Sequence, residues 1–194
     1  MTLSPPPPRL LLVSLGAPLD PDAPARLLPA VAARLSGLSG LPLQAVSTQQ
    51  EPGETLAALH ALPGAWLAAL PLDPGVWRSG GSWAEALGAW RQPCLLVIAG
   101  SRLDSGLPAA GAALLERWGV PLAGLIQWQG CWDEASRRCD GLPWLGRLGD
   151  GSAEEPPAHH LGGNAEANPD VVEAEARLLA ALRLRWRALA AQLS

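Results

Sequence analysis

The 194-residue sequence predicts an α/β fold, with a mostly parallel sheet of about six strands and helices on both faces. Short apolar runs of strand length recur along the chain, and residues 94–99 form the clearest one. These runs are continuously apolar, which is typical of strands that are buried on both faces. Segments with helical spacing of apolar residues lie between them, and glycine or proline marks most junctions.

Each strand is predicted from one such run, and the helices from their capping residues. The expected strands cover residues 9–15, 43–48, 65–70, 94–99, 122–128 and 144–148. The expected helices between them cover residues 20–37, 54–62, 82–90 and 108–118. The third helix has the clearest start, because Ser82 is followed three residues later by Glu85, a capping box. Strands that alternate with helices in this way indicate parallel pairing.

The chain divides into four expected segments. Residues 1–8 are a proline-rich, flexible N-terminus, and residues 9–148 are the α/β domain. Residues 149–168 are rich in Gly, Pro, Ala and Glu and indicate a surface linker. Residues 169–194 form a last helix that packs on the domain. Its expected apolar stripe consists of Val171, Val172, Leu178, Leu179, Leu182, Trp186, Leu189 and Leu193.

Composition and charge exclude several classes of function. The net charge of −4 argues against nucleic acid or an anionic membrane as the partner. No apolar run reaches the roughly 18 to 20 residues of a membrane span, and the first residues lack the basic start of a signal peptide. Three cysteines are an odd number and favour reduced thiols. We therefore expect a cytoplasmic protein.

Three residue types are missing from the chain. There is no Lys, Tyr or Phe, so all 14 basic residues are Arg and all nine aromatic residues are Trp. Strong GC codon bias explains this pattern, and its chemical consequence is independent of the cause. A lysine Schiff base, a lysine general base and a lysine phosphate clamp are all excluded. Of the tryptophans, we expect Trp66, Trp90 and Trp118 in the core.

The second half of the chain carries a resemblance to a known family. Residues 93–100, 107–115, 119–126 and 142–148 include the segments Pro-Cys-Leu-Leu-Val-Ile-Ala-Gly, Gly-Val-Pro-Leu-Ala-Gly and Leu-Pro-Trp-Leu-Gly, in that order. This order resembles the last three strands of dethiobiotin synthetase and its ParA/MinD-type relatives. The resemblance covers about residues 9–148 and implies a P-loop NTPase-like topology. It also implies that residues 70–81 stand where the family has an acidic loop.

The chain departs from this family at the phosphate-binding loop. The family's first strand leads into Gly-x-x-x-x-Gly-Lys-[Ser/Thr], whose amides and lysine hold phosphates. Here residues 16–24 read Gly-Ala-Pro-Leu-Asp-Pro-Asp-Ala-Pro, in which prolines remove donors and aspartates repel phosphate. The family's second-strand lysine is absent, and its adenine-binding Asn would fall near residues 127–129, where the chain has Gln-Trp-Gln. The resemblance therefore implies a degenerate member without a Walker A motif.

The first candidate site is the loop from Asp73 to Ser82. Ligands of parallel α/β sheets bind beyond the carboxyl ends of strands, where this loop is expected. Gly80, Gly81 and Ser82 offer amides at a helix N-terminus, and Arg78 adds a guanidinium for an anionic ligand. Asp73 could hold a metal or orient a water molecule. The alternative is an ordinary strand-to-helix connection with a capping box.

The second candidate site is a partner-binding face formed by Trp128, Trp132, Arg137 and Arg138 at the strand carboxyl ends. Trp and Arg are the residues that most often dominate binding at protein interfaces. Two alternative chemistries involve the cysteines and histidines of the chain. A zinc site would combine Cys131 and Cys139 with His159 and His160, but the spacing of eight and the adjacent histidines do not fit. A Cys–His nucleophile, for which Cys94 or Cys131 could serve with one of the histidines His60, His159 and His160, lacks the local motif of a hydrolase. No catalytic residue, metal or cofactor is assigned.

These features support two main hypotheses of function. The first is a non-catalytic binding or assembly protein on a degenerate P-loop-like scaffold, with a protein partner at the Trp/Arg-rich face. The second is an enzyme or small-molecule binder that recognises an anionic ligand at the loop from Asp73 to Ser82. Residual nucleotide binding is a third hypothesis, which the loop at residues 16–24 disfavours. The sequence leaves the oligomeric state undetermined.

Overall fold

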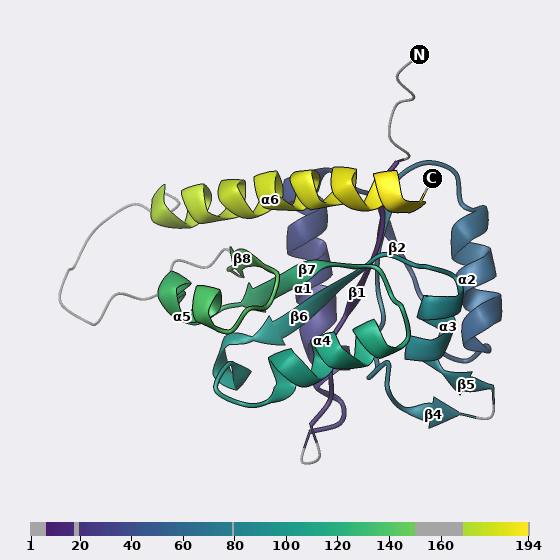
Figure 1. Ribbon diagram of the computed structural model, residues 1–194. Coiled ribbons are helices and arrows are strands. Elements are labelled where there is room, and N and C mark those ends of the chain that lie inside the picture. The colour runs from purple at the N-terminus through teal and green to yellow at the C-terminus, as the bar shows by residue number, and fades with distance from the viewer. Residues whose placement is uncertain (1–6, 18–19, 79, 150–168, 194) are drawn as a thin grey trace.

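The computed structural model describes residues 7–17, 20–78, 80–149 and 169–193, and it contains a six-stranded, all-parallel sheet between helices (Figure 1). The strand order is β2-β3-β1-β6-β7-β8. The strands are β1 (Arg9–Val13), β2 (Leu43–Gln44), β3 (Trp66–Ala69), β6 (Cys94–Ala99), β7 (Leu122–Trp128) and β8 (Trp144–Leu148). The predicted fold class is confirmed.

The helices lie in two layers, one on each face of this sheet. Their bounds are α1 (Ala23–Ser39), α2 (Pro52–Ala61), α3 (Trp83–Ala89), α4 (Leu107–Arg117), α5 (Glu134–Cys139) and α6 (Pro169–Leu193). A short 3₁₀ turn, η1 (Gly100–Arg102), follows β6. The strands β4 (Trp77–Arg78) and β5 (Gly81–Ser82) form a small antiparallel pair outside the main sheet.

The strands are mostly apolar because both faces of the sheet are covered. In β1, Leu10 and Leu12 face the layer that contains α1 and α6, while Leu11 and Val13 face α2, α3 and α4. None of these four side chains is more than 1% exposed. A continuous apolar run is the pattern that such a strand requires, and each face adds burial of apolar area worth about 25 cal/mol per Å².

The first helix runs from Ala23 to Ser39, whereas residues 20–37 were expected, so Gly37 lies inside it. Its first turn contains Pro24, whose fixed φ suits that position and whose missing N–H is not needed there. Leu28, Val31 and Leu35 are fully buried against the sheet. Gly40 ends the helix with φ of 73°, a left-handed conformation that glycine adopts without steric cost.

Three elements differ from the sequence-based expectation. The second strand is only two residues long, so most of residues 43–48 is irregular. Residues 77–82 were expected as a loop before a helix, but Trp77 pairs with Ser82 and Arg78 with Gly81 in the β4–β5 hairpin. Helix α5 was not expected at all. Six residues are too few for an apolar period, and only the cap at Asp133 marks its start.

The last helix buries a different stripe from the expected one. Leu178, Leu182 and Trp186 are buried as predicted, but Val172 is 52% exposed. Glu175 instead is 3% exposed and makes a bidentate ion pair with Arg34 of α1, at 3.0 and 2.6 Å. The buried positions 175, 178, 182, 186 and 190 follow the helical period, and Val172 lies off that line.

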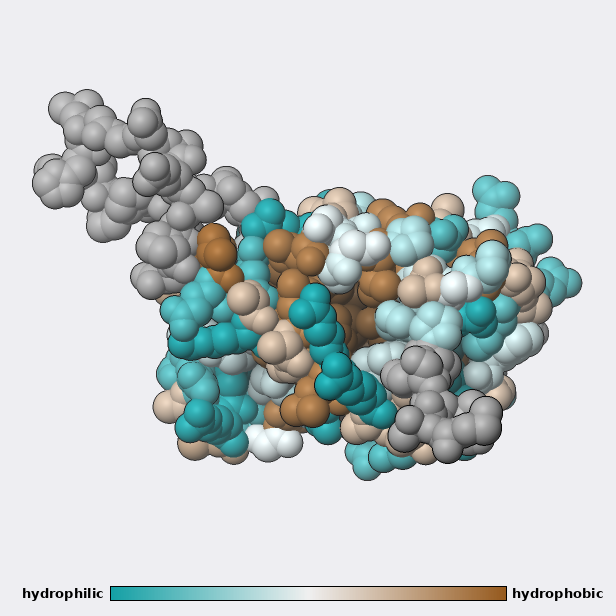
Figure 2. All heavy atoms as spheres, turned by 90° about the horizontal axis from the view of Figure 1, so that it is seen from above, coloured by the Kyte–Doolittle hydropathy of each residue, from teal (hydrophilic) through white to brown (hydrophobic). Residues whose placement is uncertain are grey.

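Helix α6 lies along β7 and β8 and extends toward the start of β1 (Figure 1). Seen from the α6 side, the surface mixes polar and apolar residues, and apolar ones gather in a hollow (Figure 2). The helix has 25 residues, yet no described helix is long and apolar enough to cross a lipid bilayer.

The connections of two neighbouring strands place a crevice at one end of the sheet. Helix α1 follows β1 on one face and leads toward β2, while α4 follows β6 on the opposite face and leads to β7. The chain therefore diverges between β1 and β6, which is a topological switch point. In open parallel sheets, ligand crevices form at such points, beyond the carboxyl ends of the strands.

Candidate functional site

A cluster of two tryptophans and one arginine lies beside the edge strand β8. The rings of Trp132 and Trp144 meet edge to face, with centroids 6.1 Å apart and an interplanar angle of 79°. The guanidinium carbon of Arg137 lies 5.2 Å from the centroid of the Trp144 ring, within cation–π range. Asp140 holds the pair, because its Oδ2 accepts the Trp144 indole N–H at 2.7 Å and lies 3.5 Å from Arg137. We call Trp132, Arg137 and Trp144 the Trp/Arg cluster.

Helix α5 positions this cluster, and Asp133 starts the helix. The carboxylate of Asp133 accepts the backbone N–H groups of Ala135 and Ser136 and the hydroxyl of Ser136. The hydrogen bond from the Ser136 hydroxyl is the main reason that the pKa of Asp133 is lowered. The cap fixes a helix that is too short to be stable alone. It thereby directs Arg137 toward Trp144.

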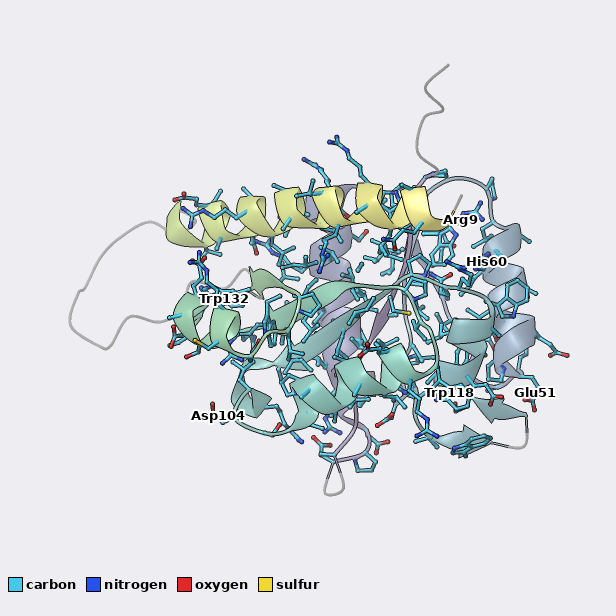
Figure 3. The ribbon with its side chains drawn as sticks, viewed as in Figure 1. Arg9, Glu51, His60, Asp104, Trp118 and Trp132 are labelled. Atoms are coloured by element: carbon cyan, nitrogen blue, oxygen red, sulfur yellow. The ribbon has the colours of Figure 1, made fainter. Side chains whose placement is uncertain are left out.

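The Trp/Arg cluster lines a hollow of about 660 Å³ between α5, β8 and α6. In Figure 3, Trp132 lies between α5 and the first turns of α6. The charged residues that line the hollow are Glu134, Arg137, Arg138, Arg147 and Arg177. Four guanidinium groups and one carboxylate thus line the hollow, and Asp140 and Glu173 beside it pair with Arg137 and Arg177.

Two of these arginines are well exposed at the rim. Arg138 pairs with Glu134 at 2.5 Å, and Arg177 pairs with Glu173, four residues earlier on α6. The arginine side chains remain 78% and 74% exposed. Exposed ion pairs of this kind contribute about 0.2–1 kcal/mol each, so an incoming carboxylate can compete with them.

The predicted partner-binding residues are only partly brought together. Trp132, Arg137 and Arg138 line the same hollow. Trp128, at the end of β7, is 8% exposed and packs in the core below α1 and α6. Trp144 was not included in the predicted face. Its side chain joins the cluster because β8 pairs with β7, and this pairing brings the start of β8 beside α5.

The predicted anion-binding loop is tied to the chain's own carboxylates. Asp73 accepts the N–H groups of Gly16 at 2.8 Å and Gly75 at 2.7 Å. A Cβ atom added to Gly80 would overlap the carboxylate of Glu51, which Figure 3 shows beside the hairpin. An anion near Gly80 would therefore meet negative charge.

The remaining residues of this loop have structural contacts. Ser82 is 2% exposed, and its hydroxyl accepts the N–H of Glu85 at 3.1 Å, as the capping box predicts. Gly81 pairs with Arg78 through the backbone in the hairpin. A Cβ atom on Gly81 would lie 2.8 Å from the Glu85 carboxylate, so this glycine is also near an acid.

A second hollow lies at the topological switch point between β1 and β6. It has a volume of about 280 Å³ and is lined by the ends of β1, β6 and β7 and the first residues of α1 and α4. Asp20, Arg26 and Arg102 line it as its charged residues. Asp20 pairs with both arginines, and its distance to Arg102 is 3.0 Å. We call this hollow the switch-point crevice. The pattern of residues along the chain did not predict it, because the order of the strands in the sheet creates it.

The cysteines and the described histidine have separate surroundings. Cys94 is fully buried, and burial raises the pKa of its thiol. Cys131 and Cys139 are exposed free thiols. His60 lies between Trp66 and Trp90, and its Nε2 is 2.9 Å from Oε1 of Gln92. The two remaining histidines lie outside the described residues.

Two tryptophans and the residues that could bind a metal remain to be described. Trp66 is 1% exposed as expected, but Trp90 is 39% exposed, which corrects its assignment to the core. Within the described residues, no group of three or more His, Cys, Asp or Glu side chains is placed to hold a metal ion.

Compared with known proteins, the sequence matches no family model and no curated protein.

Proposed function

We propose that this chain is a non-catalytic binding protein that contacts a partner protein through the Trp/Arg cluster and the arginines around it. The observation that carries the proposal is the edge-to-face pair Trp132–Trp144 with Arg137 over the Trp144 ring, at an open hollow. Trp and Arg dominate binding at interfaces because each combines a large apolar area with a specific polar group.

The charge of the hollow indicates the chemistry of the partner. Arg138 and Arg177 stand at its rim, and their ion pairs are exposed enough to be exchanged for new ones. An acidic segment would gain attraction from these arginines, and an apolar side chain within it would pack on the tryptophans. The proposed partner segment is therefore acidic, with at least one aliphatic or aromatic residue.

The edge of the sheet offers a further contact for such a segment. Within the described part of the chain, β8 pairs with β7 alone and is therefore an edge strand of the sheet. Gly146 and Arg147 of this strand line the hollow. An extended segment that enters the hollow would run past the backbone of β8, as partners do when they add a strand.

The loop after β1 supports a function without phosphate chemistry. In the resembled family, the amides of this loop bind phosphate together with a lysine. In this chain the N–H of Gly16 donates to Asp73, and there is no lysine at any position. A phosphate placed at this loop would lie beside the carboxylate of Asp73, at the position where the family provides a hydrogen-bond donor. The degenerate P-loop-like scaffold remains part of the proposal.

The test is an affinity capture followed by binding to the purified partner. Trp132→Ala should weaken binding by about 2 kcal/mol or more, the size of an interface hot spot. Arg138→Glu should slow association and reduce its dependence on salt, because it reverses a charge at the rim. Trp77→Ala and Arg185→Glu are the matched controls, since both side chains are exposed away from the hollow.

The hollow variants and the control variants together show whether the partner binds at the Trp/Arg cluster. Loss of binding in both hollow variants, with folding intact and both controls normal, would support the proposal. Binding that is equal in wild type and in both hollow variants would refute it. Hydrolysis of a nucleotide by the pure protein would contradict the non-catalytic part.

A further inference from the structure

We infer that the switch-point crevice is a binding site for a small organic monoanion with an apolar body, of the kind represented by a short-chain carboxylate. The inference is independent of the proposed partner interface, which lies at the edge strand β8. It rests on the position of the crevice, on its charged rim and on its apolar wall.

The position is where an open parallel sheet forms ligand sites. The crevice lies beyond the carboxyl ends of β1 and β6, whose following helices run to opposite faces. The floor is closed by Ser14, whose hydroxyl donates to the carbonyl of Val97 at 2.8 Å and so links the two strands. Such a crevice is a property of strand order and does not need a phosphate-binding motif.

Two arginines and an aspartate form the charged rim of the crevice. Arg26 and Arg102 share one carboxylate, that of Asp20. Among the described residues that line the crevice, these three are the charged ones. Outside the lining, Asp22 lies near Arg26 and helps to raise its pKa.

Arg102 is the better of the two arginines for a ligand. Its side chain is 32% exposed, against 62% for Arg26, so its interaction with an anion is less screened by water. It also stands on η1, directly after β6, which places it beside the mouth of the crevice. A carboxylate could accept from Arg102 in a charge-assisted hydrogen bond.

Two helices begin at the crevice. Ala23 is the first residue of α1 and Leu107 the first of α4, and both line the crevice. Neither N-cap residue, Asp22 or Gly106, caps its helix with a side-chain hydrogen bond. The N–H of Ala23 donates to the carbonyl of Asp20, and the N–H of Leu107 donates to the hydroxyl of Ser105, both at 3.3 Å. The partial positive charge at the start of a helix favours an anion nearby.

The apolar wall and the volume of the crevice indicate the size and the apolar character of the rest of the ligand. Part of the crevice is formed by apolar side chains, among them Leu15, Leu27, Ile98 and Trp128. The volume of about 280 Å³ corresponds to roughly nine water molecules at about 30 Å³ each, which suits a short chain or a single ring. A ligand with one charged end and an apolar body satisfies both parts of the crevice.

The direct test titrates the full-length protein with sodium hexanoate and with hexanamide, its neutral counterpart, and follows the backbone amides of the crevice by NMR. Hexanoate should bind at least tenfold more tightly than hexanamide, because only the carboxylate pairs with the arginines. Over the series butanoate, pentanoate and hexanoate, affinity should rise about fourfold for each methylene group that enters the wall.

Variants tie the binding to this crevice. Arg102→Gln should raise the Kd for hexanoate about tenfold or more, and Ala23→Leu should block binding by filling the space. The matched controls are Arg185→Gln and Ala30→Leu, both at exposed helix positions away from the crevice. Far-ultraviolet circular dichroism checks that each variant is folded.

Three results would overturn the inference. The first is the absence of saturable binding by hexanoate at its highest soluble concentration. The second is binding that Arg102→Gln and Ala23→Leu leave unchanged. The third is binding of inorganic phosphate in preference to hexanoate, which would remove the role of the apolar wall. Loss of partner capture in the β8 hollow affects none of these measurements, so the two proposals fail separately.

Discussion

The carboxylate of Asp73 accepts the backbone N–H of Gly16 at 2.8 Å, across 57 positions of sequence. Its second oxygen accepts the N–H of Gly75 at 2.7 Å. The contact joins the loop after β1 to the loop after β3, which lie together because β1 and β3 are neighbouring strands. The N–H of Gly16, at the start of the loop after β1, is therefore already hydrogen-bonded to a carboxylate of the chain itself.

Replacing Asp73 with Asn should destabilise the fold by about 1–3 kcal/mol, the worth of hydrogen bonds to a charged group. The amide of Asn has one acceptor oxygen for two N–H donors, and its NH₂ group would face one of them. The decrease should appear as a lower urea midpoint with an unchanged slope. Asp104→Asn is the control, since Asp104 is exposed, and equal midpoints for the two variants would contradict this role.

The ion pair between Arg34 and Glu175 should show unequal effects from its two ends. Arg34→Met leaves the carboxylate of Glu175, whose side chain is 5% exposed, buried without its partner. Glu175→Leu leaves an arginine that is 33% exposed and can be hydrated. We expect Arg34→Met to cost more, about 3 kcal/mol, and a double-mutant cycle to give a coupling of about 1–3 kcal/mol. Additive single effects would show that the pair does not couple α1 to α6.

The three thiols should differ in reactivity with a thiol reagent such as Ellman's reagent. Cys131 and Cys139 are exposed and should react rapidly in the native protein. Burial raises the pKa of Cys94, so its reactive thiolate form is scarce and its sulfur is shielded. We expect two fast equivalents in buffer and three in urea. Cys94→Ala should reduce the urea value alone, and rapid reaction of all three thiols in buffer would refute the buried position.

The cap of α5 predicts a defined pH dependence. The lowered pKa of Asp133 means that its stabilising contribution is complete above the unfolded value, about 3.9. That contribution is lost as the pH falls through the lower folded value. Because the Ser136 hydroxyl is the main cause, Ser136→Ala should raise the midpoint of an NMR titration of the Asp133 carboxyl carbon. An unchanged midpoint would mean that this hydrogen bond is not formed in solution.

The strands of the sheet could be predicted because their sequence pattern is local. The segments 94–99, 122–128 and 144–148 are mostly apolar, each follows a proline, and they match β6, β7 and β8. The β4–β5 hairpin could not be predicted in the same way. Its strands are two residues long, and their pairing depends on how the loop after β3 folds.

The candidate sites were harder to predict than the strands. Trp132 and Arg137 were identified from residue type, and Trp144 reaches them only through the pairing of β8 with β7. Trp128 has the same chemistry, yet it is 8% exposed and belongs to the core. Residue type shows what a side chain can do, whereas exposure and neighbours depend on the whole fold. The resemblance to dethiobiotin synthetase stays a prediction.

The sequence by itself determined the α/β class, the order of the main strands and helices, and the absence of any lysine chemistry. These properties follow from composition and from periods of two to four residues, which a linear chain displays directly. Only the tertiary structure decided that Asp73 meets Gly16 and that Arg26 and Arg102 share Asp20 at a crevice. It also decided that Glu175 is buried beside Arg34. Those contacts join residues far apart in the chain, and their geometry is set by which strands are neighbours in the sheet.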